Sequence, residues 1–170
     1  MKRILAAVTL FFMMCAAANA DSIGVRGAVA DTKSDEDFDA YEMFVVLDLP
    51  WAWRDRGTSR IQSQIELTGG VLDTAGQTGF LGTLGPRLAY TGERYSLDVG
   101  VGVAVLGETE FGRQDFGGSS QFIAQAGFSL GLTDRIDAGV RFRHMSDADM
   151  HHGEDLNLVL LEMSYEYLQR

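Results

Sequence analysis

The feature that most constrains how this chain can fold is a regular alternation of apolar and polar side chains. In the segment Tyr95–Leu106, every second residue is a large aliphatic one: Leu97, Val99, Val101, Val103 and Val105. Successive side chains of a β-strand point to opposite faces, so this pattern predicts a strand with one apolar and one polar face. The same alternation recurs along most of the chain and predicts an all-β fold.

Eight segments carry this pattern, separated by polar or glycine-rich breaks, and we expect one strand in each. They are Ser22–Ala30, Ala40–Trp51, Arg60–Val71, Thr78–Tyr90, Tyr95–Leu106, Ser119–Leu132, Arg135–Met145 and Leu156–Leu168. Their length, about ten residues, is what a tilted strand needs to cross a bilayer. A soluble β-sandwich would also alternate, with its apolar faces turned inward, so the pattern alone leaves both architectures open.

The N-terminus helps to choose between these architectures. Two basic residues precede the apolar run Ile4–Ala18, which leads into an A-x-A cleavage sequence at residues 18–20. This arrangement predicts a secretory signal peptide over residues 1–20 and a single exported domain over residues 21–170. The only cysteine of the chain lies in the leader, so no disulfide is expected in the exported domain.

Export, strand length and the polar faces together predict an eight-stranded antiparallel transmembrane β-barrel in the outer membrane of a Gram-negative bacterium. The polar faces carry residues such as Asp98, Arg141 and Glu162, which can pair inside a narrow barrel. Side chains fill the interior of an eight-stranded barrel, which argues against a porin. Of the 14 basic residues two belong to the leader, so 12 basic residues face 24 acidic ones in the domain. This acidic balance argues against nucleic acid as a partner.

Two polar residues interrupt the apolar face of the seventh predicted strand. His144 and Ser146 continue the parity of Phe142, so both are expected to point outward, toward lipid. Serine needs a base to become a nucleophile, histidine is the usual base, and an acid commonly orients the imidazole. Asp155, at the start of the next strand, shares the outward parity and is the expected acid, with Glu154 as the alternative.

The same residues carry a resemblance to a known family. The stretch Val140–Ala148, followed by Gly153 and Asp155, resembles the pattern of an apolar strand and His-x-Ser in the outer-membrane lipid A 3-O-deacylases, the PagL family. The segments Leu97–Gly118 and Ser119–Phe122 are also similar to that family.

The resemblance implies an eight-stranded barrel with ester hydrolase activity, working without a metal or other cofactor. The implied substrate is lipid A, or lipopolysaccharide, in the outer leaflet, cleaved at the ester-linked acyl chain of the 3-position. By the same resemblance His144 is the general base, Ser146 is the nucleophile, and Asp155 or Glu154 orients the imidazole.

One part of the motif departs from the family. The family usually has Asn after the serine, as an oxyanion donor, and Gly two positions further, where this chain has Asp147 and Asp149. An ionised carboxylate cannot donate a hydrogen bond, and losing one such donor typically costs roughly 10²–10³ in rate. We therefore expect the oxyanion site around Asp147, Ala148 and Asp149, with backbone N–H groups near Ala148 as possible replacements.

Two other functions fit parts of the sequence. A catalytically impaired structural or binding barrel would keep the strands and tolerate the two aspartates. A divalent-metal cluster could use imidazole and carboxylate ligands, but their spacing matches no defined metal signature, so no metal is expected. Its candidate ligands would be His144, Asp147, Asp149, His151 and His152. The sequence leaves open whether the barrel forms a homodimer.

Overall fold

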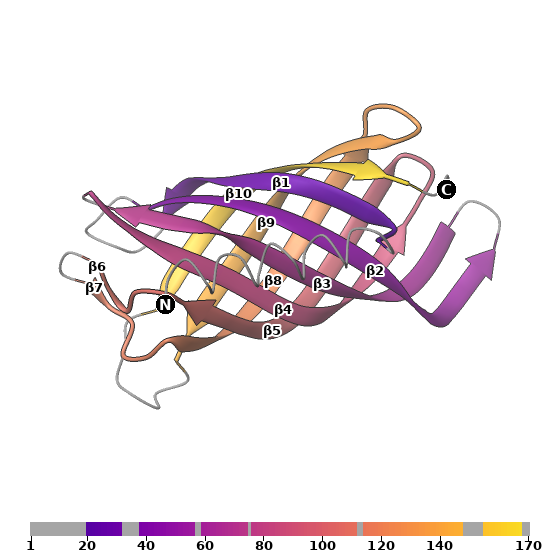
Figure 1. Ribbon diagram of the computed structural model, residues 1–170. Helices are drawn as coiled ribbons and strands as arrows, with labels where there is room; N and C mark the ends of the chain where they lie inside the picture. The colour runs from indigo at the N-terminus through magenta and orange to yellow at the C-terminus, as the bar shows by residue number, and fades with distance from the viewer. Residues whose placement is uncertain are drawn as a thin grey trace.

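The computed structural model describes residues 20–31, 38–56, 59–74, 76–111, 114–147 and 155–167. Apart from Ala20, the predicted signal peptide lies outside this part of the chain. Ten strands are assigned within it (Figure 1): β1 Ser22–Asp31, β2 Asp39–Arg56, β3 Ser59–Thr74, β4 Gln77–Thr91, β5 Tyr95–Leu106, β6 Glu110–Phe111, β7 Gln114–Asp115, β8 Ser120–Gly131, β9 Ile136–Ser146 and β10 Leu156–Glu166. No helix long and apolar enough to span a membrane occurs in the described ranges.

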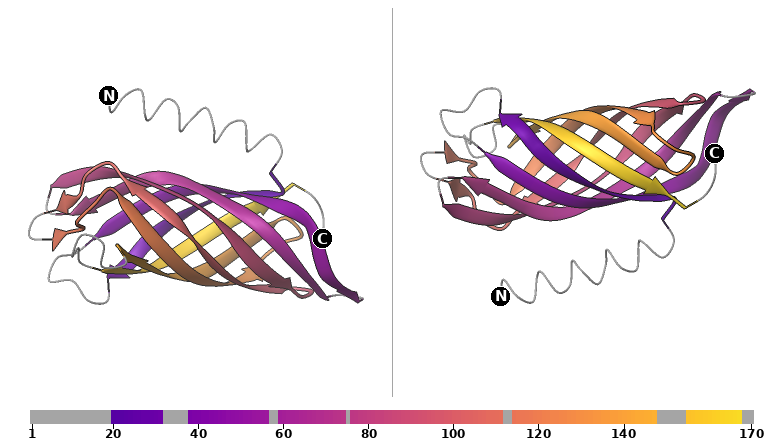
Figure 2. Two further views of the ribbon diagram at one scale, coloured as in Figure 1. Left: turned by 90° about the horizontal axis from the view of Figure 1, so that it is seen from below. Right: turned by 90° about the horizontal axis from the view of Figure 1, so that it is seen from above.

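Eight of these strands form one closed barrel in the order β1-β10-β9-β8-β5-β4-β3-β2, and β6 with β7 forms a small hairpin of its own. β1 pairs antiparallel with both β2 and β10, which closes the sheet, as Figure 2 shows from two sides. The predicted eight-stranded antiparallel barrel is therefore confirmed. The clearest difference in length is at β2, which continues beyond its expected end at Trp51 as far as Arg56.

The outer wall of the barrel is apolar. On β5 the predicted aliphatic row points outward, with 58% of Val99 and 62% of Val101 exposed. Phe122 and Phe128 on β8 and Val140 and Phe142 on β9 are exposed in the same way. An apolar belt of this extent has no favourable place in water, whereas lipid chains cover it without cost.

The inner face has two layers of different character. The layer nearest the β6–β7 hairpin is apolar and includes Leu72, Leu81, Leu106, Met145, Leu156, Leu158 and Leu160. The rings of Phe38, Phe111 and Phe116 meet edge to face above it, with centroids 5.9–6.1 Å apart. This end of the barrel thus has a dry core, which differs from the polar interior that we expected from the alternation.

The second layer is charged and lies further along the barrel. Arg26 and Arg87 each donate to Glu66 at 3.0 and 2.9 Å, and Arg141 bridges Asp98 and Glu162. Four arginines here meet four carboxylates, all nearly buried: Arg26, Arg87, Arg141 and Arg143 with Glu42, Glu66, Asp98 and Glu162. The predicted pairing of opposite charges inside the barrel is confirmed.

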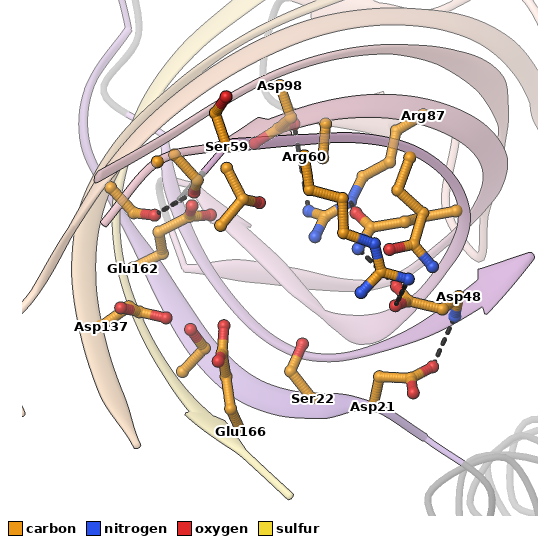
Figure 3. A pocket seen from close by; sticks show the side chains of 18 of the residues that line it. Asp21, Ser22, Asp48, Ser59, Arg60, Arg87, Asp98, Asp137, Glu162 and Glu166 are labelled. Carbon is orange, nitrogen blue, oxygen red and sulfur yellow. Dashed lines mark hydrogen bonds and ion pairs between the residues drawn. The ribbon is translucent and has the colours of Figure 1, made fainter. Parts of the chain in front are cut away.

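A polar cavity of about 740 Å³ opens in the barrel interior on the side away from the apolar layer. Figure 3 shows the side chains of Asp21, Asp48, Arg60 and Glu166 around it. None of the residues that line it belongs to the predicted catalytic group. The interior therefore offers polar surface at this end, while the predicted site lies on the outer wall.

The extension of β2 and β3 projects past the rim of the barrel (Figure 2). Pairing of β1 with β2 ends at Ser22 and Val46, so the β2 backbone beyond Val46 forms a sheet edge. Pro50 lies on this edge, where its missing N–H costs no ladder hydrogen bond. Trp51 and Trp53 follow, 62% and 66% exposed.

These two tryptophans, the only ones in the chain, are expected to lie at a membrane–water interface, where tryptophan is enriched in barrels. In vesicles of brominated lipids, bromines near the headgroup should quench Trp fluorescence more than bromines near the chain ends. Trp51→Phe and Trp53→Phe variants would report each ring alone. Absence of quenching by either lipid would contradict this placement.

Candidate active site

The end of β9 holds its side chains in alternate directions. Inward, Met145 is fully buried in the apolar layer, and Arg143 donates two hydrogen bonds to Glu42, one of them at 3.1 Å. Outward, His144 and Ser146 continue the row of Phe142, as the sequence predicts. Because packed inward residues anchor the strand on both sides of His144, the backbone that carries the two polar residues is held in place.

His144 lies between two different neighbours on the outer wall. Ala124 of β8 stands opposite it on one side and Asn157 of β10 on the other. The Nδ1 atom of His144 is 2.9 Å from Oδ1 of Asn157. Its Nε2 atom is 3.9 Å from Oδ2 of Asp155, too far for a hydrogen bond.

The contact at Nδ1 of His144 involves a residue that the sequence analysis did not identify. We expected Asp155 or Glu154 to hold the imidazole, and the structure places Asn157 at Nδ1. Asn157 shares the outward parity of Val159 and Leu161, so a polar residue on an apolar wall was the signal that could have found it. It is only 5% exposed, and its Nδ2 atom has no hydrogen-bond partner in the described part of the chain.

The other predicted site residues are placed as follows. Ser146 is half-buried, opposite Phe122 of β8. Asp147, one residue beyond β9, is 1% exposed. Ala148, Asp149 and Glu154 lie outside the described residues, so the predicted oxyanion site there stays a prediction.

The structure describes only two of the five candidate metal ligands, His144 and Asp147. Asp149, His151 and His152 lie outside the described residues. Within the described ranges, no group of three or more His, Cys, Asp or Glu side chains is arranged to hold a metal ion.

The arrangement at the end of β9 can support acyl transfer. When the imidazole proton is on Nδ1, it is donated to Oδ1 of Asn157, and Nε2 carries the free lone pair. Nε2 is then available to accept a proton from a hydroxyl on the same wall, and Ser146 is the hydroxyl two residues further along the strand. The site lies on the apolar outer wall of the barrel, outside its interior.

Comparison with known proteins finds similarity to PagL in a family model, in a relative and in a solved structure. A family model described as lipid A 3-O-deacylase (PagL) matches residues 39–166. The lipid A deacylase PagL of Bordetella bronchiseptica is 30% identical over 79 residues, which is 46% of this chain and 44% of that relative. The match thus spans less than half the length of the relative. The crystal structure of the outer membrane enzyme PagL has 18% identity and a TM-score of 0.72, covering 85% of this chain and 99% of that chain.

The closed barrel with its apolar outer wall defines a class of protein, the membrane-spanning β-barrels of bacterial outer membranes. Because the family model covers most of the barrel, the chain belongs to the lipid A 3-O-deacylase (PagL) family. It is accordingly an outer-membrane protein of a Gram-negative bacterium.

Proposed function

We propose that this protein is a lipid A 3-O-deacylase in which Ser146 is the nucleophile and His144 the general base. The observation that carries the proposal is the pair of polar residues on the apolar outer wall, with Nδ1 of His144 bonded to Oδ1 of Asn157 at 2.9 Å. Family membership supports the same reaction. The β6–β7 end of the barrel, to which the site is nearest, would face the cell exterior.

In the first half of the reaction, Nε2 of His144 takes the hydroxyl proton of Ser146 as Oγ bonds to the ester carbonyl carbon. The carbonyl oxygen becomes an oxyanion. When it re-forms the carbonyl, the bond to the 3-oxygen of lipid A breaks, and that oxygen takes the proton from His144. The acyl chain remains esterified to Ser146.

In the second half, His144 removes a proton from water, whose oxygen attacks the acyl-serine carbonyl. Collapse of this intermediate returns the proton to Ser146 Oγ and releases a fatty acid. Donors for the oxyanion would come from the region of Asp147, Ala148 and Asp149, as the sequence predicts.

Association of two copies, left open by the sequence, would be tested by chemical cross-linking in detergent.

The test is mass spectrometry of lipid A from cells expressing the protein, beside cells with an empty vector and cells expressing His144→Gln. We expect the protein to remove one ester-linked 3-hydroxyacyl group from lipid A. His144→Gln should slow this by roughly 10²–10⁴-fold, the usual contribution of a general base. Unchanged lipid A with a folded barrel in the outer membrane would overturn the proposal and favour a binding or structural barrel.

A further inference from the structure

The partner of His144 at Nδ1 is a neutral amide, although a carboxylate, Asp155 or alternatively Glu154, was expected to orient the imidazole. We propose that Asn157 is the positioning residue for His144, and that Asp155 opposes the productive state of the imidazole by attracting a proton to Nε2. This inference rests on the proposed function, because it concerns the base of that reaction. It assigns to Asp155 an effect opposite to that of a catalytic acid.

A neutral imidazole carries one N–H, on either Nδ1 or Nε2. With the proton on Nδ1, His144 donates to Oδ1 of Asn157 at 2.9 Å, and Nε2 can accept the proton of Ser146. With the proton on Nε2, the free lone pair is on Nδ1, and His144 cannot act as a base toward Ser146. The first tautomer is productive and the second is unproductive.

A carboxylate at the position of Asn157 could only accept, so it would select the productive tautomer. An amide can also turn over and donate from Nδ2 to Nδ1, which supports the unproductive tautomer. In the observed orientation Nδ2 is buried and has no partner among the described residues. Turning the amide would pair Nδ2 and leave Oδ1 unpaired instead, so the amide alone favours the productive state only weakly.

Asp155 then influences which of the two tautomers of His144 is favoured. Its Oδ2 atom is 3.9 Å from Nε2, and its side chain is 51% exposed, so a small movement would bring the two atoms into contact. A carboxylate there accepts a hydrogen bond from an Nε2–H group and thereby favours the unproductive tautomer. On the other side of His144, β8 presents Ala124, which carries no charge. Asp155, just before β10, and Asn157, on β10, thus lie at opposite nitrogens of the imidazole.

The experiment compares the kcat for deacylation of the purified protein with that of three variants. Asn157→Leu should lower kcat at least roughly tenfold, since an unoriented triad histidine can cost up to about 10⁴. Asn157→Asp should match or exceed the kcat of the unmodified protein, because a carboxylate at this position only accepts from Nδ1. Asp155→Ala should raise kcat a few-fold, because it removes the carboxylate that favours the proton on Nε2.

Asp134→Ala removes an exposed carboxylate from the β8–β9 turn and is the matched control. This variant should have the same kcat as the unmodified protein. An unchanged or lowered kcat in Asp155→Ala, or full activity in Asn157→Leu, would overturn the inference. Asp155 is exposed, so that variant remains informative even where Asn157→Leu fails to fold. Labelling of Ser146 by a fluorophosphonate probe separates the two proposals. No labelling and no deacylation by the unmodified protein would reject the function itself, whereas labelling together with the wrong order of variants would reject only this inference.

Discussion

Replacing Ser146 by alanine is expected to reduce lipid A deacylation by roughly 10⁴–10⁶-fold, because removing the nucleophile of a serine hydrolase removes the covalent route altogether. Ser146 is a small, half-buried residue at the end of β9, so its replacement should leave the barrel folded. The measurement is the rate of fatty acid release from purified lipid A in detergent. Heat-modifiable gel mobility, which distinguishes folded from unfolded barrels, reports folding in the same samples.

Ser120→Ala provides a matched control for this experiment. Ser120 begins β8 at the same end of the barrel and is exposed, but it pairs with Val105 and has no histidine beside it in the register. Its replacement should leave activity unchanged. Deacylation by Ser146→Ala within tenfold of the unmodified rate would show that Ser146 is not the nucleophile.

The strands were predictable from the sequence because their pattern depends only on the alternation of side chains within each segment. Tyr95–Leu106 is a strand with the expected bounds, and the outward direction of His144 and Ser146 follows from parity alone. Parity assigns a face of the sheet and gives no distance across strands. The residue of β10 that stands opposite His144 is fixed by register, which depends on a connection between β9 and β10 whose conformation the sequence does not reveal. For this reason the contact of Asn157 with His144 could not be derived, even though Asn157 is polar on an apolar wall.

The division of the interior into two layers was also beyond the sequence. Leu158 and Leu160 point inward at the start of β10, while Val159 between them points outward. An apolar residue on each face gives no alternation from which to read a direction. The phenylalanines that cover this layer, Phe38, Phe111 and Phe116, come from outside the predicted strand cores. The dry layer therefore depends on contacts between segments that are distant in sequence, and these contacts hold Met145, between His144 and Ser146, in place.

The charged layer below it should be sensitive to the loss of a single partner, and Arg141 is its most connected member. Arg141 donates two hydrogen bonds to Asp98 of β5 at 2.7 and 3.0 Å, and two to Glu162 of β10 at 2.9 and 3.2 Å. Its side chain is 1% exposed. The backbone of Gly127 makes room for this cluster, since a Cβ there would lie 2.6 Å from Asp98 Oδ2 and 2.7 Å from a guanidinium nitrogen of Arg141.

Arg141→Met is accordingly expected to lower the free energy of unfolding by roughly 3–5 kcal/mol, the usual cost of removing one partner from a buried ion pair. The cost arises because Asp98 and Glu162 stay buried with only more distant cations nearby, Arg87 at 3.9 Å and Arg26 at 3.6 Å. The measurement is the urea midpoint of unfolding in lipid vesicles.

Two further variants decide whether this loss reflects uncompensated charge. Adding Asp98→Asn and Glu162→Gln to Arg141→Met removes both carboxylates, so the combined variant should recover part of the lost stability. Arg135→Met removes an exposed turn arginine that donates a hydrogen bond to Tyr165. The urea midpoint of unfolding of this variant should equal that of the unmodified protein. Equal losses in Arg141→Met and Arg135→Met, or a further large drop in the combined variant, would mean that the charges inside the barrel do not stabilise it as a paired network.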